Sequence, residues 1–121
     1  MTDRRQAERR GLAAEAIAAW WLRLTGWRVL ARRYRCPVGE IDLIAARGRT
    51  LAVIEVKARA DEADALESVG LHKRRRIERA AGAYLARHPE WNNFSPRFDV
   101  IILKPWRLPR HLRDAWRPGW R

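Results

Sequence analysis

Cysteine is nearly absent from this chain, and so are several other markers of common protein classes. Cys36 is the only cysteine in 121 residues, which excludes an intrachain disulfide and a zinc site built from paired cysteines. The histidines, His72, His88 and His111, are scattered, which argues against a histidine metal site. No stretch approaches the roughly 18 apolar residues of a membrane span, and the first ten residues lack the apolar core of a signal peptide. We therefore expect a cytoplasmic protein with no membrane partner.

Acidic residues are also scarce relative to basic ones. Lys plus Arg number 26 and Asp plus Glu 14, so the formal net charge is +12, which is repulsive within a folded domain. Hydrophobic residues make up 47% of the chain, so it can bury a core and is not a disordered basic tail. The length suits one domain. A polyanion is therefore the first partner to consider.

The apolar pattern predicts a helix, three strands, a second helix and a further strand. The first helix ends before Gly26, and its apolar face combines Ala13, Ala16, Ile17, Trp20 and Leu24. Apolar runs over 27–35, 40–46 and 51–58 predict strands, the last two forming an antiparallel hairpin. A basic amphipathic helix over about 71–87 and a buried strand over 98–103 follow. We expect one α/β domain over 1–104 and an extended Trp/Arg-rich arm over 105–121.

The two strands of the hairpin carry acidic residues and a lysine at positions that can meet. Alternation places Glu55 and Lys57 on one strand face, and pairing brings Asp42 near them if the register allows. Burying two close carboxylates is costly unless a cation neutralises them, and oxygen ligands favour Mg²⁺ or Mn²⁺. A lysine beside such a metal can orient or deprotonate a water that attacks a phosphodiester. Lys57 is one of only three lysines, which suggests that a compact ammonium with an adjustable pKa is needed there.

Five segments together resemble the YraN-type family of small bacterial predicted endonucleases. They are G-x-x-x-E from Gly11, GEIDLIA from Gly39, VIEVKAR from Val53, K-x-x-R-I-x-x-A-A from Lys73 and RFDV from Arg97. The resemblance covers roughly residues 8 to 104. That family is similar to the PD-(D/E)xK nucleases, which have a restriction-endonuclease-like fold and include archaeal Holliday-junction resolvases.

The resemblance implies a fold, a cofactor and roles for four residues. The fold would be restriction-endonuclease-like, with a mixed sheet flanked by helices, and the cofactor Mg²⁺ or Mn²⁺. Asp42 and Glu55 would bind the metal, Lys57 would serve the attacking water, and Glu15 would act on the metal directly or through water. The implied reaction is cleavage of DNA, with branched or otherwise structured DNA among the substrates. A homodimer would supply the two active sites that a junction requires.

Basic residues around these motifs are the expected DNA contacts. They would bind phosphate, and so position DNA without specifying its sequence. The candidates are Arg32, Arg33, Arg35, Lys73, Arg74, Arg75, Arg76 and Arg79. The aromatic residues Trp106, Trp116 and Trp120 either stack on unpaired bases or pack onto the domain or a partner.

Plainer interpretations compete with the nuclease. An E-x-K pattern is often a solvated ion pair on a strand. The sequence supports an ordinary surface position for Glu15 nearly as well as a role at the metal. Glu40 and Asp99 are better explained by capping or structural ion pairs. A nucleic-acid-binding module without catalysis on the same fold is the main alternative, and a basic adaptor that binds RNA or a protein through the arm is the third.

Overall fold

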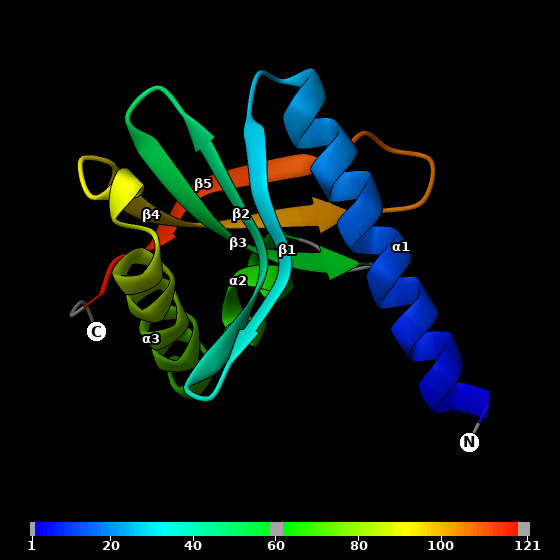
Figure 1. Ribbon diagram of the computed structural model, residues 1–121. Coiled ribbons are helices and arrows are strands. Elements are labelled where there is room, and N and C mark those ends of the chain that lie inside the picture. The colour runs from blue at the N-terminus through cyan, green and yellow to red at the C-terminus, as the bar shows by residue number, and fades with distance from the viewer. Residues whose placement is uncertain (1, 59–61, 119–121) are drawn as a thin grey trace.

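A five-stranded mixed sheet forms the centre of the molecule, with its strands in sequential order (Figure 1). The computed structural model describes residues 2–58 and 62–118. The strands are β1 (Arg28–Cys36), β2 (Gly39–Arg47), β3 (Thr50–Ala58), β4 (Ser95–Leu103) and β5 (Arg110–Trp116). Only β3 and β4 pair in parallel, which requires a crossover connection. The helices α2 (Glu62–Ser68) and α3 (Leu71–Arg87) and the 3-10 turn η1 (Pro89–Trp91) provide it.

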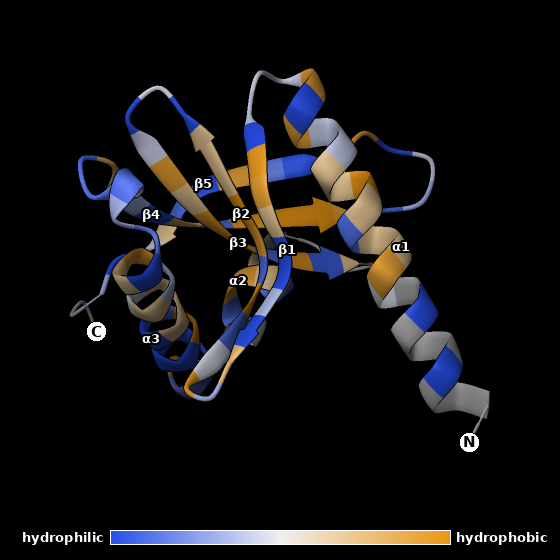
Figure 2. Cartoon of the chain, in the orientation of Figure 1, coloured by the Kyte–Doolittle hydropathy of each residue, from blue (hydrophilic) through white to orange (hydrophobic). Residues whose placement is uncertain are grey.

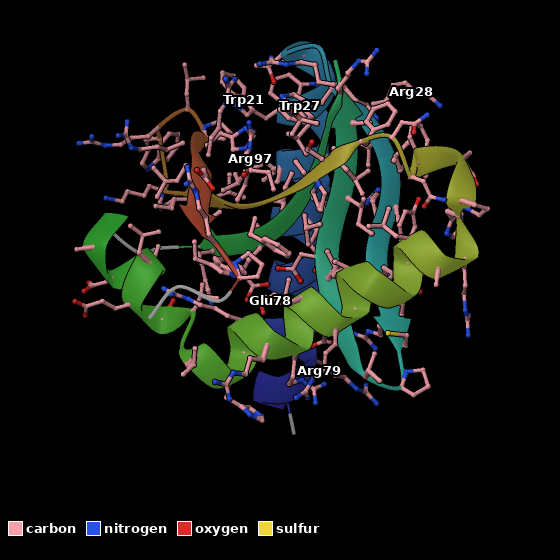
Figure 3. The ribbon with its side chains drawn as sticks, turned by 90° about the vertical axis from the view of Figure 1, so that its left-hand side faces the viewer. Trp21, Trp27, Arg28, Glu78, Arg79 and Arg97 are labelled. Atoms are coloured by element: carbon pink, nitrogen blue, oxygen red, sulfur yellow. The ribbon has the colours of Figure 1, made fainter. Side chains whose placement is uncertain are left out.

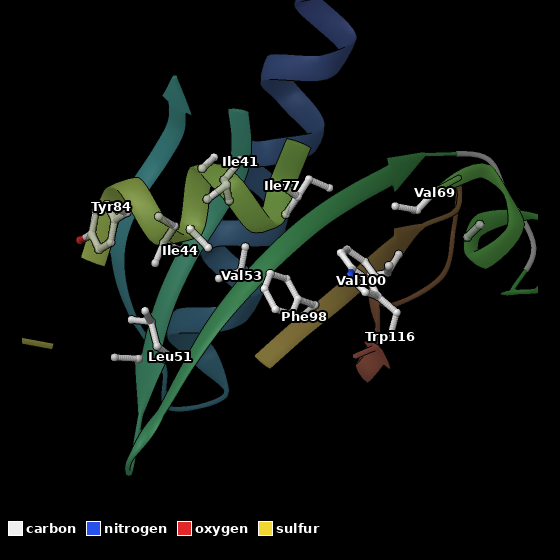
Figure 4. Packing of buried hydrophobic residues seen from close by; sticks show 14 of the residues in the cluster. Ile41, Ile44, Leu51, Val53, Val69, Ile77, Tyr84, Phe98, Val100 and Trp116 are labelled. Atoms are coloured by element: carbon white, nitrogen blue, oxygen red, sulfur yellow. The ribbon is translucent and has the colours of Figure 1, made fainter. Parts of the chain in front are cut away.

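Helices cover both faces of the sheet, so each face has its own apolar core. The long helix α1 (Thr2–Leu24) packs its Ala18, Ala19 and Leu22 on one face. On the other face α3 contributes Ile77 and Tyr84 to a larger cluster that extends to Trp116 (Figure 4). This arrangement confirms the expected α/β class and is consistent with a restriction-endonuclease-like fold. In the part of the chain that the structure describes, no helix is long and apolar enough to cross a membrane.

The sequence pattern missed α2 and β5. Residues 110–116, which were expected in an extended arm, pair antiparallel with β4 as the last strand of the sheet. A register shift between Phe98 and Val100 and a left-handed Asp114 (φ 55°) interrupt this pairing, and they hide the alternation of a strand. Trp116 packs on Phe98 with 5.3 Å between ring centroids, which confirms packing for this tryptophan. Trp120 lies outside the described residues.

The apolar helix face that the sequence indicated does not contact the sheet. Ile17, Trp20 and Leu24 are 49%, 56% and 60% exposed, and apolar residues are visible along the outside of α1 (Figure 2). The face that packs on the sheet contains Ala18 and Ala19, whose small side chains let the helix approach closely. Because α1 is apolar on both sides, periodicity alone could not identify its buried side.

A buried acidic residue ties β4 to β5. Asp99 is fully buried and accepts hydrogen bonds from Arg97 Nε and Nη2 (2.9 and 2.8 Å) and from the Asp114 N–H (2.9 Å). His111 Nε2 lies 2.7 Å from the same carboxylate. Arg97 also stacks against Trp27, which lies next to it in Figure 3. The structural ion pair that the sequence suggested for Asp99 is therefore confirmed.

Candidate active site

The register of β2 and β3 brings two carboxylates together. Leu43 pairs with Ile54, so Asp42 and Glu55 are adjacent one step further along the antiparallel pair. Asp42 Oδ2 accepts a hydrogen bond of 2.8 Å from the Val56 N–H, which fixes its side chain against β3. The proximity that the sequence left dependent on register is thus present.

Two lysines meet at Glu55, which is only 6% exposed. Lys57 Nζ lies 3.6 Å from Glu55 Oε2, and Lys73, near the start of α3, contacts the same oxygen atom. The sequence placed Lys73 among the phosphate contacts and missed its place beside the acidic pair. Its signal was the rarity of lysine, because two of the three lysines in the chain converge here.

Glu15 belongs to the same cluster. It is 8% exposed, so the interpretation as a surface residue is wrong. Its side chain hydrogen-bonds with Asp42, and its Oε1 lies 3.8 Å from Arg33 Nε without a hydrogen-bond partner. Burial raises the pKa of Glu15, although the Arg33 charge opposes this. Three acidic side chains from α1, β2 and β3 therefore converge in a partly buried space.

The protonation of the acidic pair reflects this crowding. Burial, followed by the hydrogen bond and the charge of Glu55, raises the pKa of Asp42 to about 8. Burial also acts to raise the pKa of Glu55, but the hydrogen bond with Asp42 and the ammonium groups of Lys73 and Lys57 lower it overall. One proton on Asp42 thus relieves the repulsion that a bound cation would relieve in its place.

Lys57 has an environment that favours loss of its proton. Burial lowers its pKa and the charge of Lys73 lowers it further, while the charge of Glu55 opposes both. At a given pH a larger fraction of such a lysine is neutral, and only the neutral amine can accept a proton from water. The side chain suits the role of orienting or deprotonating a water molecule.

The donor set fits a hard divalent cation. Asp42 and Glu55 provide adjacent carboxylates, and Glu15 adds a buried oxygen without a hydrogen-bond partner. Within residues 2–58 and 62–118, no group of three or more His, Cys, Asp or Glu side chains is arranged to hold a metal ion, so Glu15 does not complete a three-ligand site with Asp42 and Glu55 in this conformation. Two carboxylates suffice for Mg²⁺, which typically keeps waters and takes substrate phosphate oxygens as its other ligands.

An open groove of about 460 Å³ leads to the acidic pair. Its lining includes Asp42, Glu55, His72, Lys73 and Arg76. One wall is fixed by a close approach of β2 to α3, where a Cβ on Gly39 would lie 2.1 Å from the Arg76 carbonyl oxygen. Glycine is thus required at the start of the GEIDL segment, and the acidic pair is open to an external substrate.

The expected phosphate contacts have different environments. Arg32 and Arg35 on β1 and Arg75, Arg76 and Arg79 on α3 are exposed, and Arg79 points outward from α3 in Figure 3. Arg35 is 3.6 Å from Glu40 in an exposed ion pair, as suggested for Glu40. Arg74 Nε and Nη2 donate to the carbonyls of Val69 and Leu66, which accounts for Arg74 within the fold.

Comparison with known proteins identifies close relatives over most of the chain. A family model described as uncharacterised protein family UPF0102 matches residues 14–103. A UPF0102 protein of Parvibaculum lavamentivorans is 53% identical over 112 residues, covering 93% of this chain and 84% of that protein. One from Agrobacterium fabrum is 51% identical over 113 residues, covering 93% of each chain. One from Paramagnetospirillum magneticum is 50% identical over 115 residues, covering 92% and 89%.

Proposed function

The chain belongs to the UPF0102 (YraN) family, and we propose that it is a metal-dependent endonuclease that hydrolyses phosphodiester bonds in DNA. The observation that carries the proposal is that Asp42 and Glu55 line an open groove, with Lys57 Nζ 3.6 Å from Glu55, in a protein of net charge +12. The acidic pair suits a divalent cation that would activate the reaction. The strongly basic surface around it suits a polyanionic substrate such as DNA.

A comparison between two acidic sites within the chain supports a binding role. Asp99 is buried too, but its hydrogen bonds with His111, Arg97 and the Asp114 N–H outweigh burial and lower its pKa. The Asp42–Glu55 pair instead has a carboxyl whose pKa is raised to about 8. Asp99 has the partners of a structural carboxylate, whereas both lysines beside the pair contact Glu55 and leave Asp42 with a deficit of positive charge. Such a deficit fits a site that is completed by a ligand.

Each residue of the site has a defined task in this proposal. Asp42 and Glu55 hold Mg²⁺ or Mn²⁺, which would stabilise negative charge on the phosphoryl oxygens and activate water. Lys57 orients the water or accepts its proton. Glu15 supports the metal directly or through water, and Arg33 holds Glu15 in place. Exposed arginines on α3 and β1 contact phosphates and position the DNA.

A symmetric dimer would let the protein cut both strands of a junction, and α1 offers a surface for it. Its outer face combines the large Ile17, Trp20 and Leu24 with the small Ala13 and Ala16, all exposed. Large residues of one helix can pack against small residues of an antiparallel copy, as an isologous interface requires. We propose that a second copy of this chain covers that face.

Cleavage of labelled linear, flapped and four-way-junction DNA with Mg²⁺, Mn²⁺ or EDTA tests the proposal. The wild type is expected to cut at least one substrate with metal and none with EDTA, and Asp42→Asn is expected to bind that substrate without cutting it. Tight binding without cleavage by the wild type in every metal would favour the non-catalytic nucleic-acid-binding module.

A further inference from the structure

The loop that joins β4 to β5, residues 104–109, presents an aromatic side chain that the fold does not use. Trp106 is fully exposed, and Leu108 is 74% exposed. Trp106 also has a left-handed backbone with φ of 63°, which is unfavourable for a bulky residue and is found at ligand-binding positions more than elsewhere. Packing within the domain therefore does not account for this tryptophan.

The same loop borders a cavity of about 950 Å³ that is rich in positive charge. Trp21, near the C-terminal end of α1, and Thr25, in the turn that follows, contribute to its lining, and Figure 3 shows Trp21 near this end of the helix. Among the described residues, the lining contains no acidic side chain, and its cationic members are Lys104, Arg107, Arg110 and Arg113. Aromatic rings beside several cations are suited to a ligand that has both planar bases and phosphates.

The loop also begins at the end of the sheet where the candidate active site lies. In the parallel pairing of β3 and β4, Lys57 is opposite Ile102 and Ala58 is opposite Leu103. Lys104 therefore begins the loop two positions beyond the row of Lys57, or about 7 Å along the strand. The arrows of β3 and β4 end on the same side of the molecule in Figure 1. The cavity is lined from the α1 side and the active-site groove from the α3 side, so a strand of DNA that leaves the active site would reach the loop around the ends of β3 and β4.

We propose that the β4–β5 loop binds unpaired nucleotides, with Trp106 stacking on a base and Lys104 and Arg107 contacting phosphates. The inference rests on the proposed function and names its substrate class, which is DNA that has a single-stranded segment beside the cleaved bond. An exposed tryptophan among cations also suits an anionic membrane surface. The concave lining beside Trp106 favours the nucleotide, because insertion into a membrane does not require a concave site.

Fluorescence anisotropy with labelled oligothymidylate and with a mixed-sequence duplex, both in EDTA, tests the proposal. Trp106→Ala is expected to weaken single-strand binding roughly 5- to 150-fold, the range for losing one stacked base, and to change duplex binding less than about twofold. Trp106→Phe retains a ring and is expected to restore most of the affinity. The thermal unfolding of both variants should match the wild type, because Trp106 is fully exposed.

Three results would overturn the assignment. They are unchanged single-strand binding by Trp106→Ala, equal weakening for both nucleic acids, and Trp106-dependent binding to phosphatidylglycerol vesicles without an effect on oligonucleotides. EDTA prevents cleavage, so the result does not depend on the nuclease proposal. Trp106-dependent single-strand binding in a protein that never cuts DNA would overturn the nuclease and leave the nucleotide-binding loop in place.

Discussion

The single residue Asp42 should make the thermal stability of the protein depend on pH. Without a divalent cation its pKa is raised from 3.8 to about 8. A raised folded-state pKa gives stability that is fully present below pH 4 and is lost as the pH rises toward 8. We expect Asp42→Asn in EDTA to unfold at a temperature at least about 3 °C above the wild type at pH 8, and near the wild-type temperature at pH 4.

Divalent cations provide the matching control for this prediction. Mg²⁺ or Mn²⁺ would replace the proton on Asp42, so it should raise the unfolding temperature of the wild type at pH 8 and have little effect on Asp42→Asn. Differential scanning calorimetry measures both effects. A wild type that is as stable as the variant at pH 8 in EDTA, and that does not respond to metal, would count against a cation site at this pair.

Asp99 is expected to have the opposite pH dependence and a structural role. Removing it in Asp99→Ala leaves Arg97 without its partner, and we expect a loss of about 3–5 kcal/mol in the free energy of unfolding. The lowered pKa of Asp99 means that its contribution is present above pH 4 and is lost as the pH falls through the folded-state value. Urea unfolding at pH 7 and pH 3 measures this difference.

The exposed Glu40–Arg35 pair is a suitable control for Asp99. Both side chains are about 60% exposed, so Glu40→Ala should change stability by less than about 1 kcal/mol. Equal effects of Asp99→Ala and Glu40→Ala would show that the buried network does not stabilise the sheet.

The sequence predicted which residues of the candidate site lie together better than it predicted their protonation states. The spacing of Asp42, Glu55 and Lys57 indicated a cluster, because alternation and hairpin pairing are local properties of strands. The sequence could not assign Lys73 to this cluster, because α3 reaches Glu55 only through the long connection between β3 and β4. The burial of Glu15 likewise depends on how α1 is rotated against the sheet.

The outer face of α1 leads to a prediction at the scale of one element. If a second copy covers this face, Ile17→Glu places a charge inside the interface and is expected to convert a dimer to a monomer. Sedimentation equilibrium of the wild type and the variant measures the change. Gly82→Glu adds the same charge to an open position on α3, so it should leave the dimer intact.

A wild type that sediments as a monomer throughout an accessible concentration range would contradict the α1 interface. The nuclease proposal would remain, since one active site is complete within one chain. Two cuts at a junction would then require two separate binding events.

Elements with strong local patterns were predictable, and elements defined by their neighbours were not. The hairpin of β2 and β3, the basic helix α3 and the strand β4 follow from apolar runs and turn residues. For β5, the register shift opposite Phe98 and the left-handed Asp114 remove regular alternation, so the strand is stabilised by its pairing with β4. Either apolar side of α1 could be buried as judged from the sequence. The side with Ala18 and Ala19 packs on the sheet.

At the scale of the whole molecule, binding and catalysis should be separable. The charge of +12 is spread over many arginines, whereas the proposed chemistry depends on three side chains. Affinity for DNA should therefore fall steeply with salt and hardly respond to changes within the acidic pair. The rate of cleavage of bound DNA should instead fall strongly when a residue of the acidic pair is changed.

The most direct test measures both quantities on the same proteins. Single-turnover cleavage with Mg²⁺ and the Kd in EDTA would be compared for the wild type, Asp42→Asn, Glu55→Gln and Lys57→Ala on the best-cleaved DNA. We expect each variant to lose at least about 100-fold in cleavage rate, while its Kd stays within about threefold of the wild type. Wild-type cleavage rates in all three variants, or cleavage that persists in EDTA, would contradict the assignment of this site as a metal-dependent nuclease centre.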